Sequence, residues 1–275
     1  MIRLVAAFLL VSLSTHAETC RFSGTTSYDG RLAVRANTTQ ADGILTLDVT
    51  IEFTVHAWMT DYRYLGQEIS TWTVGEGRSA ALRSVAVNQR SLASGNVKRQ
   101  QWDVFSRNGL WLEGYRIQAK SLDDFQKRYP GFAQHWSPAS FGQSWLPDFR
   151  RIGAERRPDL DLPATDVQTP LAFAFYWSRF LSPSGSRVSL VLPSFKRDKQ
   201  VSIGVGSAVA GGGWNRWSTT LRHPALETRP ASLAAVWVSP DHRLLQLTFD
   251  IQTSWVAGQA TLRAEGCEDI QISPR

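Results

Sequence analysis

The chain has 275 residues, of which 43% are hydrophobic and 20% charged, and its formal net charge is +6 at pH 7. A basic excess of this size is typical of a solvated surface, and the clusters Arg150-Arg151, Arg156-Arg157 and Lys196-Arg197 are small. A nucleic-acid interface needs basic residues gathered on one face with aromatic side chains between them. We therefore expect no nucleic-acid partner.

The first seventeen residues have the pattern of an export signal. Arg3 gives a basic start, residues 4–13 form an apolar core, and Thr15-His16-Ala17 is a cleavage site of the small-residue kind. This apolar core is shorter than the roughly 20 residues of a membrane-spanning helix, and no later apolar run approaches that length. We predict a chain without a transmembrane segment that is cleaved before Glu18 and is periplasmic or secreted.

The two cysteines, Cys20 and Cys267, lie near opposite ends of the predicted mature chain. Exported proteins fold in oxidising compartments, where two lone cysteines usually pair. The sequence therefore predicts a Cys20–Cys267 disulfide that holds the two ends together.

An unbroken alternation of apolar and polar residues runs from Leu45 to His56. This two-residue period predicts a long antiparallel strand with one face on a core and one in water. Shorter strands are predicted before and after it, and hairpin sequences such as Asp42-Gly43 and Asn108-Gly109 separate them. These strands are 31–36, 67–74, 82–87, 97–105 and 110–119.

The period breaks at Ser121, where a capping residue and two acidic residues predict a short helix to about Arg128. Residues 130–163 hold five prolines and no clear period, which predicts a long irregular segment. Loops of this length usually bind or cover something.

Thr169-Pro170 is the start of a second predicted helix, in which most side chains from Leu171 to Leu181 are apolar. Such a helix is buried or covers a sheet. Strands are predicted again after Pro183. They span 187–192, 200–205, 217–222, 233–238, 243–251 and 255–264.

Roughly a dozen strands joined by short turns, with only two helices, exclude a doubly wound α/β sheet. The predicted fold class is mainly β: a large curved antiparallel sheet or half-open barrel with one or two covering helices. We assign residues 18–275 to a single β-rich domain, with a boundary near 150–165 as the alternative.

No catalytic motif is complete. Gly142-Gln143-Ser144-Trp145-Leu146 lacks the final glycine of a nucleophile elbow. The four histidines after residue 17 are widely spaced, so no metal site and no cofactor are predicted. A carboxylate pair of the glycosidase type would be recognised only by its separation in space. Asp103, Glu113 and Asp148 are flanked by aromatic residues and are the candidate acids.

Four aromatic residues differ from the others because they lie in the irregular segment. They either plug one end of the sheet or line a site for an apolar or sugar ligand, and the plug is favoured. These candidate ligand-binding residues are Phe132, Trp136, Phe141 and Trp145.

The second half, with its Thr169-Pro170-Leu171 helix, the strand 187–192 and the segment 236–244, resembles an uncharacterised exported bacterial domain-of-unknown-function group. The resemblance is carried by residues 165–265. That group is similar in layout to periplasmic lipoprotein carriers, in which a curved sheet and a helical lid enclose an apolar cavity. The resemblance implies the fold and brings no catalytic residues.

These features predict an exported, non-enzymatic protein that binds an apolar or amphipathic envelope ligand, with a lipid as the expected kind of partner. One alternative is a secreted carbohydrate-active enzyme with a carboxylate pair. Another is a structural or partner-binding envelope protein, which would expose an apolar patch of several hundred Å².

Overall fold

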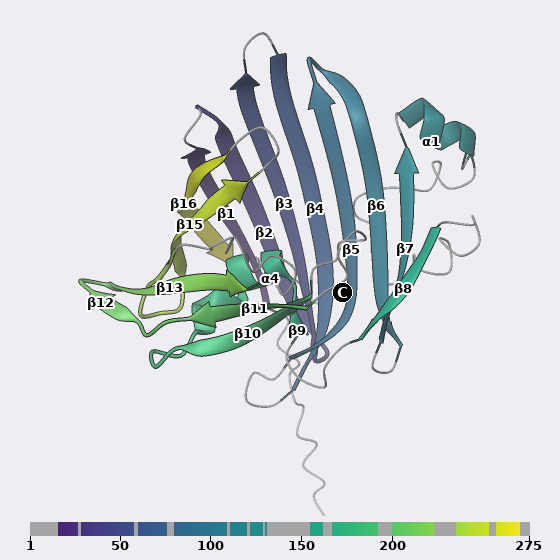
Figure 1. Ribbon diagram of the computed structural model, residues 1–275. Coiled ribbons are helices and arrows are strands. Elements are labelled where there is room, and N and C mark those ends of the chain that lie inside the picture. The colour runs from purple at the N-terminus through teal and green to yellow at the C-terminus, as the bar shows by residue number, and fades with distance from the viewer. Residues whose placement is uncertain are drawn as a thin grey trace, which may run out of the picture.

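The computed structural model describes residues 16–26, 29–57, 60–75, 80–108, 111–119, 122–128, 130, 155–161, 167–191, 200–222, 235–252 and 257–269. These residues form one strongly curved sheet (Figure 1). Its strands are β1 (His16–Thr26), β2 (Arg31–Ala41), β3 (Ile44–Ala57), β4 (Thr60–Val74), β5 (Ala80–Ala93), β6 (Asn96–Asn108), β7 (Trp111–Ala119), β8 (Glu155–Asp161), β9 (Val167–Gln168), β10 (Ser186–Val191), β11 (Gln200–Val205), β12 (Val209–Gly211), β13 (Trp214–Arg222), β14 (Ala235–Val238), β15 (Leu244–Gln252) and β16 (Ala257–Asp269).

The order of the strands is β8-β7-β6-β5-β4-β3-β2-β1-β16-β15-β14-β13-β11-β10-β9, with β12 beside β13. Neighbouring strands are antiparallel except for β9 and β10, which are parallel. Among the described residues, β8 and β9 at the two ends of this order do not pair with each other, so the sheet is open. The predicted fold class is confirmed.

The described residues include three short helical segments beside the sheet: α1 (Leu122–Arg128), α4 (Pro170–Phe175) and the 3-10 helix η3 (Trp177–Phe180). Figure 1 shows α1 beside the end of β7, whereas α4 lies between the wall of long strands and the strands of the second half. Among the segments that the structure describes, no helix is long and apolar enough to cross a membrane.

The structure corrects three details of the sequence prediction. The polar run at the end of the predicted irregular segment contains β8, an edge strand paired with β7. Its Pro158 and its charged residues are typical of edge strands, which explains why it has no alternating pattern. The predicted helix from Leu171 to Leu181 is broken at Tyr176. The strands β1, β9 and β12 have no counterpart in the predicted strands.

We call the face of the sheet that meets α4 the inner face. Strand register places Leu45, Leu47 and Val49 of β3 on this face, directly opposite Trp72, Ser70 and Glu68 of β4. One buried core joins residues of both halves. It includes Phe22 and Val34 from the first strands, Phe173 from α4, and Leu247 and Leu262 from the last strands.

Candidate functional site: the inner face of the sheet

The segment α4–η3 fills part of the inner face with aromatic side chains. Phe173 is completely buried and Trp177 is 8% exposed. The ring of Phe175 lies 5.3 Å from that of Phe22, and the ring of Trp177 meets Trp72 edge-on at 6.0 Å. These contacts between ring centroids are in the range of favourable aromatic pairs. The segment is therefore packed into the core and does not lie loosely over it.

Thr169 connects the start of α4 to the sheet. Its hydroxyl oxygen accepts a hydrogen bond from Ala172 N at 3.1 Å, which is the capping bond that Thr169-Pro170 predicts. The same hydroxyl donates to Glu68 on β4. Thr169 is 0% and Glu68 3% exposed. The position of the helix is thus fixed by a polar contact inside the core.

Burial raises the pKa of Glu68 to about 7, and the hydrogen bond from Thr169 opposes this rise. The negative form of a carboxyl group is disfavoured where water is excluded, so Glu68 holds its proton to a much higher pH than an exposed glutamate. Glu68 is therefore an ionisable group near neutrality within an apolar core.

Tyr64 lies two positions before Gly66 on the inner face of β4. A side chain on Gly66 would come within 2.9 Å of the Tyr64 ring, so the glycine leaves room for the ring to lie along the strand. Burial, and then the charge of Glu68, raise the pKa of Tyr64 to about 12. The phenol is therefore neutral at physiological pH. Its ring continues the apolar surface of β3 toward the polar residues of β5 and β6.

A second buried polar contact fixes the end of η3. Arg179 Nη1 lies 2.7 Å from Glu18 Oε2, and both side chains are about one-tenth exposed. The guanidinium also lies over the Tyr176 ring at 4.8 Å. His242, in the turn between β14 and β15, makes a 2.9 Å hydrogen-bond contact through Nδ1 with the Arg179 carbonyl oxygen. The α4–η3 segment is thus held at both ends.

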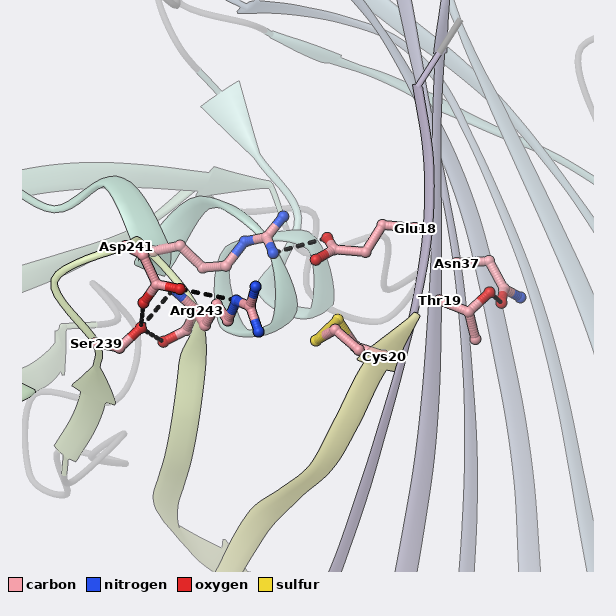
Figure 2. The surroundings of a disulfide bond; sticks show 9 residues. Glu18, Thr19, Cys20, Asn37, Ser239, Asp241 and Arg243 are labelled. Atoms are coloured by element: carbon pink, nitrogen blue, oxygen red, sulfur yellow. Dashed lines mark hydrogen bonds and ion pairs between the residues drawn. A yellow bond between two sulfur atoms is a disulfide. The ribbon is translucent and has the colours of Figure 1, made fainter. Parts of the chain in front are cut away.

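Glu18, the ion-pair partner of Arg179, lies beside the disulfide between Cys20 and Cys267 (Figure 2). The two cysteines are direct partners across the β1–β16 pair. The predicted disulfide is therefore confirmed, and it joins the first strand to the last. The start of the predicted mature chain is thus linked both to β16 and to the helical segment.

The inner face becomes polar on β6 and β7. Asp103, opposite Arg116, is 1% exposed and receives two hydrogen bonds from its guanidinium at 2.8 and 2.9 Å. The Gln101 amide donates a third at 2.6 Å. Charge-assisted bidentate pairs of this kind are the strongest polar contacts in proteins. Glu68 lies in the same row of the sheet, with Val87 between it and Asp103.

Arg99 extends this polar surface to an exposed position on the inner face. It donates to the Gln101 side-chain oxygen at 2.5 Å. The Gln118 amide, with its oxygen toward Arg99, accepts from Nε at 2.8 Å. Within the described part of the chain, these partners are neutral amides, so the positive charge of Arg99 is not balanced by a carboxylate in direct contact.

The candidate residues from the sequence are placed only in part. Asp103 is a buried ion-pair partner of Arg116. Glu113 lies on β7 opposite Ser106, and its side chain is outside the described set. Asp148 and the aromatic residues of the irregular segment also fall outside the residues that the structure describes. The latter are Phe132, Trp136, Phe141 and Trp145.

Comparison with known structures supports the fold. The chain is similar to a crystal structure described as a β-barrel-like protein of the domain of unknown function DUF1849 from Brucella abortus. The TM-score is 0.53 at 8% sequence identity, and the match covers 94% of this chain and 99% of that one. No family model and no curated protein sequence matches the chain.

This similarity agrees with the predicted resemblance to an uncharacterised bacterial domain group, but it is not confined to residues 165–265. At 8% identity it shows a shared fold and nothing about activity.

Sequence reasoning missed the residues that join the helix to the sheet. Glu68 lies on the same face of β4 as Tyr64 and Trp72. An acidic residue at an inward position of the strand was the signal that could have identified it. Arg116 alternates in phase with Gly114 and Gln118, so its inward position could have been found from the period of β7. Arg179 had no comparable signal, because its partner Glu18 is 161 positions away.

Proposed function

We propose that this is an exported, non-enzymatic binding protein that holds an amphipathic molecule against the inner face of its sheet. The apolar part of the ligand lies over β2 and β3, and its anionic group meets Arg99 on β6. The proposal depends on one observation: the inner face changes from apolar to cationic across adjacent strands.

The change follows one row of the sheet. Leu32 of β2 is opposite Phe53 of β3, and Phe53 is opposite Tyr64 of β4. Tyr64 is opposite Ser91 of β5, which is opposite Arg99 of β6. Phe53 and Tyr64 are half-buried and Arg99 is exposed, in contrast to the fully buried row of Leu47. An amphipathic molecule has an apolar body and a charged end, so it matches this change from apolar to charged side chains.

We propose the aromatic residues Phe132, Trp136, Phe141 and Trp145 as further ligand-binding residues. Their segment follows α1, which lies at the end of β7, and leads to the edge strand β8. The signal-like pattern of residues 1–17 supports a location in the periplasm or outside the cell, and a disulfide in the fold is consistent with it. A lipid of the envelope is the expected ligand.

The experiment is in two parts. Protein purified from the exported fraction is extracted with organic solvent, and the extract is analysed by mass spectrometry for a lipid. The delipidated protein is then titrated with a dansylated long-chain fatty acid and with the corresponding fatty alcohol. We expect a co-purifying lipid and saturable binding of both probes, with the acid bound more tightly.

Arg99→Gln removes the charge and keeps a side chain that can hydrogen-bond. We expect it to weaken fatty-acid binding about tenfold, the effect of losing one charge-assisted hydrogen bond, and to leave alcohol binding unchanged. Arg263→Gln, at an exposed arginine on β16 that bonds Gln246, is the matched control and should bind as the wild type does. A protein that carries no lipid and binds neither probe would refute the proposal.

The described residues give less support to the alternatives. A carboxylate pair for hydrolysis must reach substrate and water, whereas Asp103 and Glu68 are both buried and already hydrogen-bonded. A partner-binding surface needs a contiguous apolar patch. The large hydrophobic side chains exposed in the described segments are Tyr62 on β4 and Val209 on β12, which lie on separate strands.

A further inference from the structure

The hairpin formed by β12 and β13 carries a patch on the outer face of the sheet, the face opposite the inner-face site. Figure 1 shows this hairpin extending away from the wall of long strands. Gly211 pairs with Trp214 and Val209 with Arg216, so these positions share one face of the hairpin. Trp217, on the other face of β13, is buried in the core. The face with Val209, Trp214 and Arg216 therefore points away from the core.

Trp237 of β14 extends this surface, because it pairs directly with Arg216. Its neighbours along β14, Val236 and Val238, are buried, which places the Trp237 indole on the outer face. The Arg216 guanidinium lies over the Trp237 ring, 5.2 Å from its centroid, which is a cation–π contact. The hairpin patch is defined as Val209, Trp214, Arg216 and Trp237.

The tip of the hairpin is apolar. Residues 206–215 include no charged side chain. Val209 is 60% exposed, and both tryptophans of the hairpin patch are half-buried. A side chain at Gly211 would overlap the Trp214 indole, so the glycine lets the ring lie across the tip. One exposed valine is ordinary on a protein surface, whereas two outward-facing tryptophans beside it are not, because tryptophan is highly buried on average.

The charge of the hairpin patch is positive. Arg216 is exposed, and within the described segments no carboxylate is paired with it. Its neighbours across the strands on this face are Val209 and Trp237, neither of which is acidic. A guanidinium stacked on an aromatic ring still has N–H groups that can bind a phosphate. The hairpin patch therefore complements a surface that is apolar in one layer and anionic in the next.

The size of the hairpin patch favours a bilayer over a protein partner. A stable protein–protein interface needs about 800 Å² on each side, far more than these side chains supply. A bilayer needs less, because a few apolar side chains can enter the boundary between headgroups and acyl chains. Tryptophan and arginine suit this boundary, since each has an apolar body and a polar end that stays at the headgroups.

We propose that the hairpin patch docks the protein on an anionic lipid bilayer. Val209 enters the boundary between headgroups and acyl chains, and the two tryptophans lie at the level of the headgroups. Arg216 binds a lipid phosphate. This goes beyond ligand binding on the inner face, because docking brings that site to a membrane, where an amphipathic ligand can be taken up or released.

The test is co-sedimentation of the exported protein with lipid vesicles. One set of vesicles contains phosphatidylcholine and phosphatidylglycerol in equal amounts, and the other contains phosphatidylcholine alone. We expect saturable binding to the anionic vesicles that weakens as salt is added, since salt screens the attraction between Arg216 and the lipid. Binding to phosphatidylcholine alone should be at least about fivefold weaker.

Val209→Asp should weaken binding to the anionic vesicles at least about tenfold, because it removes the buried valine and brings a negative charge to the lipid. Arg216→Gln should weaken binding about fivefold on anionic vesicles and hardly at all on phosphatidylcholine. Thr25→Asp and Arg31→Gln make the same changes of charge at exposed positions on β1 and β2. The strands β14, β15 and β16 separate these positions from β13, so both control variants should bind as the wild type does.

Thermal melting checks that all four variants fold. A wild type that does not bind the anionic vesicles would overturn the proposal, as would equal binding by Val209→Asp and Thr25→Asp. Sedimentation equilibrium without lipid tests for a second copy as the occupant. A dimer that Val209→Asp abolishes would assign the hairpin patch to self-association and overturn membrane docking. Because the vesicle experiment uses no fatty-acid probe and leaves Arg99 unchanged, failure of either proposal leaves the other intact.

Discussion

Thr169 and Glu68 are 101 positions apart in the chain and share one hydrogen bond inside the core. The threonine hydroxyl also caps α4, so a single side chain defines both where the helix begins and where it meets the sheet. The carboxyl group that receives this bond has a pKa of about 7 because it is buried. The docking of the helix is thus linked to pH.

We expect Glu68 to make the fold less stable as pH rises. The pKa of this carboxyl is about 7 in the folded protein against an ordinary value of 4.5. Between these values the folded state binds the proton and the unfolded state has lost it, so stability is greatest below 4.5 and declines as pH rises through 7. Urea unfolding measures this decline. Between about pH 5 and pH 8, the unfolding free energy of Glu68→Gln should fall by roughly 2 kcal/mol less than that of the wild type.

The control for this measurement is Glu52→Gln, which removes an acid that is 44% exposed and paired with Arg63. It should change the slope of stability against pH only slightly, because exposed ion pairs contribute little. Identical slopes for the wild type and Glu68→Gln would contradict the assignment.

The disulfide should contribute much of the stability of the sheet. Cys20 and Cys267 enclose most of the chain, with a separation of 247 residues. The chain-entropy model assigns a loop of this length about 5 kcal/mol, an upper figure for a real protein. The double variant Cys20→Ser/Cys267→Ser should melt markedly lower than the oxidised wild type. A reducing agent should lower the melting temperature of the wild type and leave that of the variant unchanged.

Much of the first half of the fold could be predicted from the sequence, since the strand from Leu45 to His56 lies on the core with one face only. A two-residue period then determines both the secondary structure and the direction of each side chain. The same reasoning failed for β8, where both faces lack an apolar pattern. Pairing of Cys20 with Cys267 was predictable because these are the two cysteines of the chain.

The candidate site was harder to predict, because it depends on contacts between distant residues. Asp103 was found as an acid among aromatic residues, but its buried partner Arg116 depends on the register of β6 with β7. The inner-face position of Arg99 depends on the same pairing across several strands. Local patterns carry no information about such partners. From the sequence alone, the inward polar residues of β6 and β7 look the same as those of an ordinary exposed strand face.

The Asp103–Arg116 pair should stabilise the protein only while both members are present. Both are buried, at 1% and 7% exposure. Arg116→Met leaves a buried carboxylate without its cation and should lower the unfolding free energy by about 3 kcal/mol or more. The double variant Asp103→Leu/Arg116→Met should recover most of this loss, since apolar pairs often replace buried ion pairs at little cost. Chemical denaturation of the wild type, Asp103→Leu, Arg116→Met and the double variant gives the coupling free energy, and additive losses would show that the pair is not coupled.

Phe173 should be the side chain of α4 whose loss costs the most, since it is completely buried within the core cluster. Phe173→Ala should lower the unfolding free energy by about 3 to 5 kcal/mol, because the removed ring leaves a cavity that the sheet cannot fill. Val209→Ala, at a position 60% exposed on β12, should change stability by less than about 0.5 kcal/mol.

An apolar cavity of this kind stays dry and accepts small apolar molecules. Benzene should therefore raise the melting temperature of Phe173→Ala and leave those of the wild type and Val209→Ala unchanged. If α4 instead detached from the sheet in the variant, benzene would give no stabilisation, and the wild-type contact between Phe22 and Phe175 would be lost as well.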